Sequence, residues 1–377
     1  MRFLNFLIKP ASSLCNLRCR YCFYEDEACN RSEKSMGIMM TQTVDALLSE
    51  AFSLIDPNGM VHFAFQGGEP TMAGLVYFRG FVARVKEFCP QGVQVSYSIQ
   101  TNGMVLDEDW AEFFKDNDFL VGLSMDGFKE LHNMNRVDIH GDGSWSRLCR
   151  SLSLLQRFNV QVNILCVVTA QCARKPEKVY TQLKKLGVSY MQFIPCMDPM
   201  NRPRGMETFS LTPDLYGSFL CRLFDLWYDD WKSGCYRSVR LFDDYIHIIL
   251  GDQPGTCATC GQCGSYFVVE ADGSVYPCDF YVLDEWKMGT LGSQSLAEIA
   301  ASPLRAKFLT FGTEKPAECQ QCRWRTLCNG GCKHDWISQD NRQRNYFCSS
   351  FQKFFSYAES RLLHIAREEY AALQKRS

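Results

Sequence analysis

Between residue 40 and about residue 200, short apolar runs rich in β-branched and aromatic residues alternate with stretches that repeat apolar residues at helical spacing. The runs that predict strands are Val61–Phe65, Val93–Ile99, Phe119–Ser124, Gln161–Val168 and Ser189–Pro195. The stretches that predict helices are Thr41–Leu54, Leu75–Phe88, Asp107–Asp116, Trp145–Phe158 and Pro176–Leu186. This alternation predicts an α/β fold with a parallel sheet, either open or curled into a barrel.

The pattern changes after about Pro213. Two amphipathic stretches, Leu215–Trp231 and Val239–Leu250, lead into a cysteine-rich region at 257–348, and a helix over Ser350–Gln374 closes the chain. Within that region, Tyr266–Ala271 and Ser274–Tyr276 flank an Asp-Gly turn and predict a hairpin. We therefore expect two domains, 1–235 and 236–377, the second held together by metal because its apolar core is thin.

Composition narrows the compartment and the partners. Forty basic residues nearly balance 42 acidic ones, so the net charge does not favour binding to nucleic acid or to an anionic membrane. The N-terminal stretch, broken by Lys9 and Pro10, is too short for a secretory signal, and no run of about 18 apolar residues predicts a membrane span. We expect a cytoplasmic protein, whose 20 cysteines act as metal ligands or catalysts more often than as disulfides.

Three cysteines near the start, Cys15, Cys19 and Cys22, have the spacing C-x₃-C-x₂-C. Iron–sulfur cubes and structural zinc normally take four protein ligands, so three thiolates on one loop leave a position open for a non-protein group. The alternatives are a zinc knuckle with a fourth ligand elsewhere, or three unrelated buried cysteines. The open position favours chemistry over structure.

Polar and glycine-rich segments follow three of the predicted strands, where active groups of parallel sheets gather. They are Gln66-Gly67-Gly68-Glu69-Pro70, Gln100-Thr101-Asn102-Gly103 and Ser124-Met125-Asp126-Gly127. The glycine pair lets backbone atoms approach a ligand closely, although a glycine pair before proline is also a common turn. Gln66 and Gln100 face the same space and are candidates to hold a substrate peptide, or are ordinary polar rim residues.

A second set of cysteines has the spacing C-x₂-C-x₅-C-x₃-C from Cys319 to Cys332. Cys348 follows it, and Cys263 and Cys278 precede it. Taken alone, these spacings suit a pair of zinc sites as well as iron–sulfur clusters.

The cysteine loop followed by GGEP resembles the radical S-adenosylmethionine (SAM) superfamily, and the second cysteine set resembles its SPASM domain. The segments FAFQGGEPTMAGL, SIQTNG, NILCVVT and above all VVEADGSVYPCDFYVLD are similar to the anaerobic sulfatase-maturating enzymes over nearly the whole chain. This resemblance implies a partial, TIM-like (β/α)₆ barrel with a C-terminal SPASM domain and closing helix.

The resemblance also implies cofactors, SAM and three [4Fe–4S] clusters, and the residues that hold them. Cys15, Cys19 and Cys22 would hold the cluster that binds SAM. One auxiliary cluster would use Cys257, Cys263, Cys278 and Cys332, with Cys260 as an alternative to Cys257, and the other Cys319, Cys322, Cys328 and Cys348. SAM would contact Tyr21, Tyr24, Gly68, Ser124, Arg136 and Met197.

In that family, a 5′-deoxyadenosyl radical takes a hydrogen atom from a Cys or Ser side chain of a sulfatase, which becomes Cα-formylglycine. The resemblance places the general base at Asp279, whose other reading is a turn residue bonded to backbone. It implies that auxiliary clusters accept an electron, that the substrate is an unfolded sulfatase or a sulfatase-motif peptide, and that the donor is a low-potential protein such as flavodoxin or ferredoxin. We expect a monomer.

Two other functions remain open from the sequence. A SPASM maturase that crosslinks or epimerises a ribosomally made peptide would use the same machinery, although such enzymes usually carry an added recognition domain and only 14 residues precede Cys15. A non-enzymatic iron–sulfur carrier or zinc scaffold would leave SAM intact. The preference for Cys or Ser is not fixed by the sequence.

Overall fold

The computed structural model describes residues 1–310, 315–339 and 342–375, which form two compact units. The first contains residues 1–125, 132–163 and 264–309, and the second contains residues 126–131, 164–263, 310, 315–339 and 342–375. The division passes through three elements, α5 (Lys129–Asn135), β7 (Gln161–Val168) and α13 (Pro303–Thr310). The predicted domain boundary near Cys235 stays a prediction.

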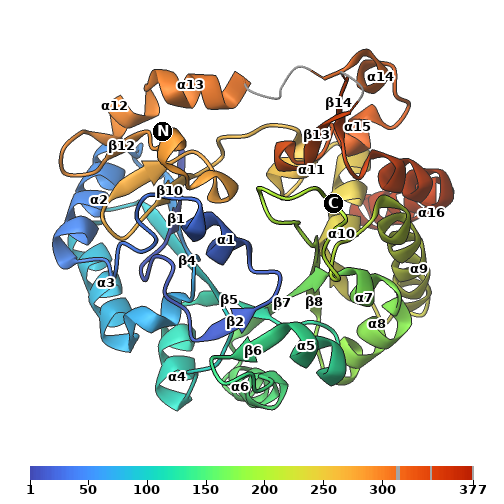
Figure 1. Ribbon diagram of the computed structural model, residues 1–377, viewed down its shortest axis with the longest axis horizontal. Helices are drawn as coiled ribbons and strands as arrows, with labels where there is room; N and C mark the ends of the chain where they lie inside the picture. The colour runs from blue at the N-terminus through green and yellow to red at the C-terminus, as the bar shows by residue number, and fades with distance from the viewer. Residues whose placement is uncertain (311–314, 340–341, 376–377) are drawn as a thin grey trace. The chain divides into compact units, whose positions relative to one another are not determined.

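The first unit is built on a sheet whose strand order is β12-β11-β10-β1-β3-β4-β5 (Figure 1). The strands are β1 (Phe3–Ile8), β3 (Met60–Phe65), β4 (Gln94–Thr101), β5 (Phe119–Ser124), β10 (Phe267–Val269), β11 (Ser274–Tyr276) and β12 (Gly289–Thr290). The five strands from β10 to β5 in that order are parallel to one another, while β11 and β12 are antiparallel additions at the edge. A separate small ladder joins β2 (Leu17–Cys19) to β6 (Arg136–Asp138).

The helices of this unit bury the aromatic face of the sheet. Phe63 and Phe65 alternate with the less buried His62 and Ala64 on β3, and they meet Phe81 and Phe78 of α3 edge-on, with ring centroids 5.3 and 4.9 Å apart. This alternation buries one face of the strand against helices and leaves the other face less buried. The helices are α1 (Phe23–Cys29), α2 (Thr41–Leu54), α3 (Leu75–Phe88), α4 (Glu108–Asp116), α6 (Trp145–Arg157) and α12 (Leu296–Ala300), with short 3₁₀ turns η1 (Pro70–Ala73), η2 (Asp279–Tyr281) and η3 (Asp284–Trp286).

Register brings the ends of four parallel strands to one edge of this sheet. Ile8 lies between Val269 and Phe65, and Phe65 pairs with Ile99 on the next strand. The residues that follow these positions are Glu270, Lys9, Gln66 and Gln100. Four polar side chains therefore leave adjacent strands at the carboxyl edge, where parallel sheets place their sites.

The second unit contains the end of β7 paired in parallel with β8 (Tyr190–Pro195), which pairs with β9 (Ser238–Val239). Its long helix α16 (Cys348–Gln374) packs on α9 (Pro213–Lys232) and α10 (Arg240–Leu250). Phe354 of α16 meets Phe224 edge-on and stacks on Phe242. The remaining elements are α7 (Ala170–Ala173), α8 (Pro176–Lys185), α11 (Cys257–Cys260), α14 (Ala317–Gln320), α15 (Arg325–Cys328), η4 (Lys333–Asp335), β13 (Trp336–Gln339) and β14 (Arg342–Asn345).

Nearly all strands and long helices expected from the sequence are present within a few residues of their predicted ends. The α/β fold with a parallel sheet is confirmed. Among the described residues, no helix combines the length and apolarity needed to span a lipid bilayer.

Candidate active site

The loop with the first three cysteines lies between β1 and α1 and is tied to β6, where Cys19 pairs with Arg136. Several N–H groups surround its thiols. The Leu17 amide and the Asn102 side chain donate to Cys15 Sγ at 3.4 and 3.7 Å, and Arg136 Nη1 lies 4.0 Å from Cys19 Sγ. Donors around a sulfur stabilise its negative charge, so these groups partly offset the cost of holding a buried thiolate in this loop.

Burial shifts the protonation of these thiols. It raises the pKa of Cys15 to about 11, and it raises the pKa of Cys22 against the opposing effect of the Glu25 and Tyr24 amides at the start of α1. Burial therefore favours the protonated thiols of Cys15 and Cys22, and a metal that binds them must displace protons.

The GGEP segment is hydrogen-bonded through its backbone to the start of the same loop. The Gly68 amide donates to Ser12 O at 2.9 Å and the Glu69 amide to Leu14 O at 2.7 Å. A Cβ atom on Gly68 would lie 2.4 Å from Leu14 O, so no larger residue fits without moving the loop. Close backbone approach, inferred for this glycine from sequence, is what the structure contains.

Of the other residues predicted to contact SAM, Ser124, Arg136 and Tyr21 lie in the first unit, like the cysteine loop. The Ser124 hydroxyl, at the end of β5, accepts a hydrogen bond from Gln100 Nε2 at 2.9 Å. The Arg136 guanidinium lies 5.4 Å from the centre of the Tyr21 ring. Met197 follows β8 and belongs to the second unit. Contact of any of these residues with SAM stays a prediction.

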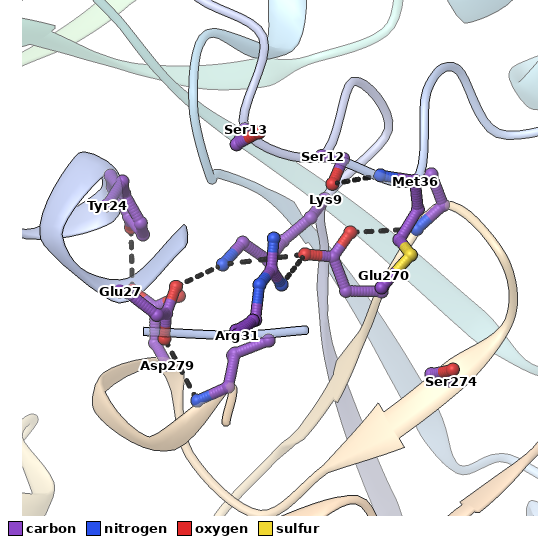
Figure 2. A network of polar contacts seen from close by, with 12 residues as sticks. Lys9, Ser12, Ser13, Tyr24, Glu27, Arg31, Met36, Glu270, Ser274 and Asp279 are labelled. Atoms are coloured by element: carbon purple, nitrogen blue, oxygen red, sulfur yellow. Dashed lines mark hydrogen bonds and ion pairs between the residues drawn. The ribbon is translucent and has the colours of Figure 1, made fainter. Parts of the chain in front are cut away.

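A buried network of charges lies at the carboxyl edge of the sheet (Figure 2). Lys9 Nζ contacts Glu27 Oε2 at 2.7 Å and Glu270 Oε1 at 3.8 Å, and Arg31 Nη1 contacts the same Glu270 oxygen at 2.6 Å. Burial disfavours the Lys9 cation, but attraction to Glu27, Glu270 and Asp279 outweighs it and raises the pKa of Lys9. Burial raises the pKa of Glu27 to about 7, against the opposing charge of Lys9.

Asp279 adjoins this network from the turn that follows Cys278. Its Oδ2 accepts from Tyr24 Oη at 2.6 Å and from Gln66 Nε2 at 3.2 Å. Its Oδ1 is buried and accepts no hydrogen bond from the described residues. Burial raises the pKa of Asp279, opposed by Lys9 and by the hydrogen bond from Tyr24.

The five charged groups Lys9, Arg31, Glu27, Glu270 and Asp279 carry three negative charges and two positive ones when all are ionised. One uncompensated negative charge in a buried site raises the electrostatic free energy, so uptake of one proton would stabilise this group of five. The carboxylate oxygen available for it without breaking a hydrogen bond is Asp279 Oδ1.

The other charged residues of this network, Lys9, Glu27, Arg31 and Glu270, were not predicted from the sequence. Lys9 directly follows the apolar run of β1, as Gln66 follows β3, so its place at a strand end was a readable signal. The pairing of Arg31 with Glu270 joins residues 239 apart and has no sequence signal. Tyr24 was predicted to contact SAM, and the structure brings its hydroxyl to Asp279; Gln66 joins the same pair.

In the second unit, a cavity of about 520 Å³ is lined by four cysteines, Cys319, Cys322, Cys328 and Cys348. Burial, together with the charge of the other three thiols, raises the pKa of Cys328 to about 11. Four thiols around one hollow, with no competing histidine or carboxylate donor besides the exposed Glu318 among the lining residues, match the all-thiolate ligation of an iron–sulfur cube.

The other predicted set is divided between the units, with Cys278 in the first and Cys257, Cys263 and Cys332 in the second. Burial raises the pKa of Cys257, and the nearby thiols of Cys263 and Cys260 raise it further. Cys260 Sγ instead donates to Pro254 O at 3.4 Å.

Nowhere in the described ranges do three or more His, Cys, Asp or Glu side chains converge as ligands of a single ion. A cube binds its thiolates at separate corners, so thiols spread over a loop or around a cavity are compatible with it. The donor set of both regions is thiolate, which is the chemistry that iron–sulfur clusters require.

Comparison with known proteins first defines the class. Residues 10–171 match the radical SAM superfamily, and residues 257–323 match SPASM, an iron–sulfur cluster-binding domain. The chain is therefore a radical SAM enzyme, a class that binds a [4Fe–4S] cluster and SAM, with a SPASM domain suited to further clusters.

Individual relatives define the family. The cysteine-type anaerobic sulfatase-maturating enzyme of Clostridium novyi strain NT is 43% identical over 369 residues, 97% of this chain and 98% of the relative. The solved structure of native anSMEcpe with bound AdoMet and Kp18Cys peptide is 41% identical, with a TM-score of 0.92 over 97% of this chain and 99% of that one. A serine-type enzyme of Klebsiella pneumoniae is 31% identical over 93% of this chain and 86% of its own length. The chain belongs to the family of anaerobic sulfatase-maturating enzymes.

Proposed function

We propose that this chain oxidises a cysteine side chain of a sulfatase to Cα-formylglycine. Similarity to the cysteine-type relative, higher than to the serine-type one, supports cysteine as the target. The observation that carries the chemistry is Asp279, a buried carboxylate with one oxygen held by Tyr24 and Gln66 and the other without a donor among the described residues.

Three groups of cysteines would hold three [4Fe–4S] clusters. Cys15, Cys19 and Cys22 would hold the cluster that binds SAM, and the cavity cysteines Cys319, Cys322, Cys328 and Cys348 would hold a closed one. Cys257, Cys263, Cys278 and Cys332 would hold the third. Cys257 is preferred over Cys260 because the Cys260 thiol is engaged with Pro254 O.

For SAM, we assign Gly68, Ser124 and Arg136 as contacts beside the cysteine loop, together with Tyr21, Tyr24 and Met197. Gly68 offers bare backbone against that loop, and Arg136 offers a fork suited to a carboxylate. When bound, SAM and its cluster supply a carbon radical that takes a hydrogen atom from the substrate β-carbon, and the closed clusters supply an acceptor for the remaining electron.

Asp279 takes the proton of the substrate thiol at Oδ1. Loss of one hydrogen atom, one proton and one electron converts the Cβ–S single bond to a thioaldehyde, which water turns into the aldehyde with release of hydrogen sulfide. Uptake of the proton neutralises the excess negative charge of the buried network, which makes Asp279 a favourable acceptor. Tyr24 and Gln66 hold the carboxylate so that Oδ1 keeps its direction.

The partners follow from the same chemistry. The substrate is an unfolded sulfatase or a sulfatase-motif peptide, and the electron donor is a low-potential protein such as flavodoxin or ferredoxin. The chain acts as a monomer. Incubation of the reduced, anaerobically reconstituted chain with SAM and matched Cys and Ser peptides tests the proposal. We expect 5′-deoxyadenosine and an aldehyde on the Cys peptide, and no cleavage when Cys15, Cys19 and Cys22 are replaced by alanine. Intact SAM with the wild-type chain would refute the proposal.

A further inference from the structure

Asn102, the residue after β4, is buried between the GGEP segment and the cysteine loop. Its side-chain amide contacts Asn16 Oδ1 at 2.8 Å and Cys15 Sγ at 3.7 Å. Asn102 is therefore a side-chain donor to the sulfur of the first loop cysteine.

The orientation of the Asn102 amide is dictated by its other partners. The Met104 backbone N–H, which can only donate, lies 3.0 Å from Asn102 Oδ1. The oxygen must therefore face Met104, and the NH₂ group must face Asn16 and Cys15. One hydrogen serves Asn16 Oδ1, and the other is left for the sulfur.

The backbone of Asn102 is fixed as firmly as its side chain. The Asn102 amide donates to Glu69 Oε2 at 2.7 Å. The other oxygen of Glu69 accepts from the hydroxyls of Thr101 and Thr71, each at 2.6 Å. Glu69 is buried, so this carboxylate anchors β4 to the GGEP segment and leaves Asn102 little freedom to turn away from Cys15.

We propose that Asn102 is a positioning residue that sets the reduction potential of the SAM-binding cluster through an N–H···S bond to Cys15. This inference rests on the proposed role of Cys15 as a ligand. A hydrogen bond to a ligand sulfur withdraws negative charge and stabilises the reduced form, which carries one electron more. It also offsets the nearby negative charge of Glu69, which acts on Cys15 in the opposite sense.

The test is a redox titration of the reconstituted chain. The reduced SAM-binding cluster is quantified from the part of the electron paramagnetic resonance signal that changes when SAM is added. For Asn102→Ala and Asn102→Ser, we expect the ratio of reduced to oxidised cluster at a fixed potential to fall about tenfold, which is 59 mV for one electron. Iron content should stay at the wild-type value. Asn117→Ala removes a comparable side-chain bond, to Phe113 O at 2.9 Å on α4, and should leave the ratio unchanged.

A second measurement, on the wild-type chain, tests the inference even if the Asn102 variants fail to assemble their clusters. With ¹⁵N-asparagine incorporated, the SAM-sensitive signal should show a nitrogen coupling that persists in labelled Asn16→Ala. An absent coupling, a coupling lost in Asn16→Ala, or a wild-type ratio in a fully loaded Asn102→Ala chain would overturn the inference. These outcomes leave SAM cleavage intact, whereas the absence of both cleavage and a SAM-sensitive signal in the wild-type chain would refute the proposed function instead.

Discussion

Replacement of Asp279 by asparagine separates its proposed role in catalysis from a role in structure. Asparagine has the same size, and its carbonyl oxygen can accept from Tyr24 and Gln66 as Asp279 Oδ2 does. The amide nitrogen then takes the place of Oδ1, which accepts no hydrogen bond from the described residues, so no existing bond is lost. What disappears is the ability to accept a proton.

The size of the expected effect follows from that loss. A positioned general base contributes about 10²–10⁴-fold, so formylglycine formation should slow by this factor. At about 1.36 kcal/mol per decade, the barrier rises by about 2.7–5.4 kcal/mol. Hydrogen abstraction does not need the base, so 5′-deoxyadenosine should still form, and its ratio to aldehyde should rise. Single-turnover assays that quantify both products by mass spectrometry measure this ratio.

A matched substitution in the hairpin that precedes Asp279 controls for general damage. Asp272 occupies the exposed turn between β10 and β11, and its side-chain hydrogen bonds among the described residues are to Ser274, so Asp272→Asn should keep wild-type rates and product ratio. Asp279→Asn should keep wild-type iron content and SAM affinity. Wild-type aldehyde formation by Asp279→Asn would refute its assignment as the base, and lost iron would show that it acts on the cluster held by its neighbour.

Three further outcomes can be measured. Cys319→Ala should lower iron from about 12 to about 8 per chain while SAM cleavage continues, and an unchanged iron content would remove that ligand assignment. Gly68→Ala, which places a Cβ 2.4 Å from Leu14 O, should cost about 1–3 kcal/mol and weaken SAM binding in equilibrium dialysis, whereas Gly80→Ala in open space on α3 should stabilise by about 1 kcal/mol. Burial raises the pKa of Asp243 to about 6 from 3.8, so the folded chain holds a proton that the unfolded chain has lost between these values, and stability falls as the pH rises through them. Asp243→Asn stays neutral, so its free energy of unfolding relative to wild type, measured by denaturant titration, should rise from pH 4 to pH 7 by at most about 3 kcal/mol; a constant difference would contradict this.

The elements that local patterns define were predictable from the sequence. Phe119–Ser124 and Gln161–Val168 were expected with the bounds that β5 and β7 have, because alternating or continuous apolar runs between turn residues specify strands directly. The hairpin around Asp272 and Gly273 was found for the same reason: Gly273 has a φ of +86°, which the turn requires. The strand β1 was missed because its apolar run was weighed only as an export signal.

The candidate site was predictable only where a motif carries it. The cysteine spacings and the GGEP segment identified the two regions of thiols and the close approach at Gly68. The neighbours of Asp279 could not be predicted, because Tyr24 lies 255 residues away in the sequence and is brought there by tertiary packing. The same holds for Asn102 and Cys15, which only the register of β4 beside the cysteine loop brings together.

The position of β1 has a consequence for synthesis on the ribosome. One side of this strand pairs with β3, which emerges soon after it, but the other side pairs with β10, some 260 residues later in the chain. At about 5–20 residues per second, the nascent chain presents an unpaired apolar edge for on the order of tens of seconds. The yield of folded protein in heterologous production should therefore rise at lower growth temperatures or with abundant chaperones, independently of the supply of iron.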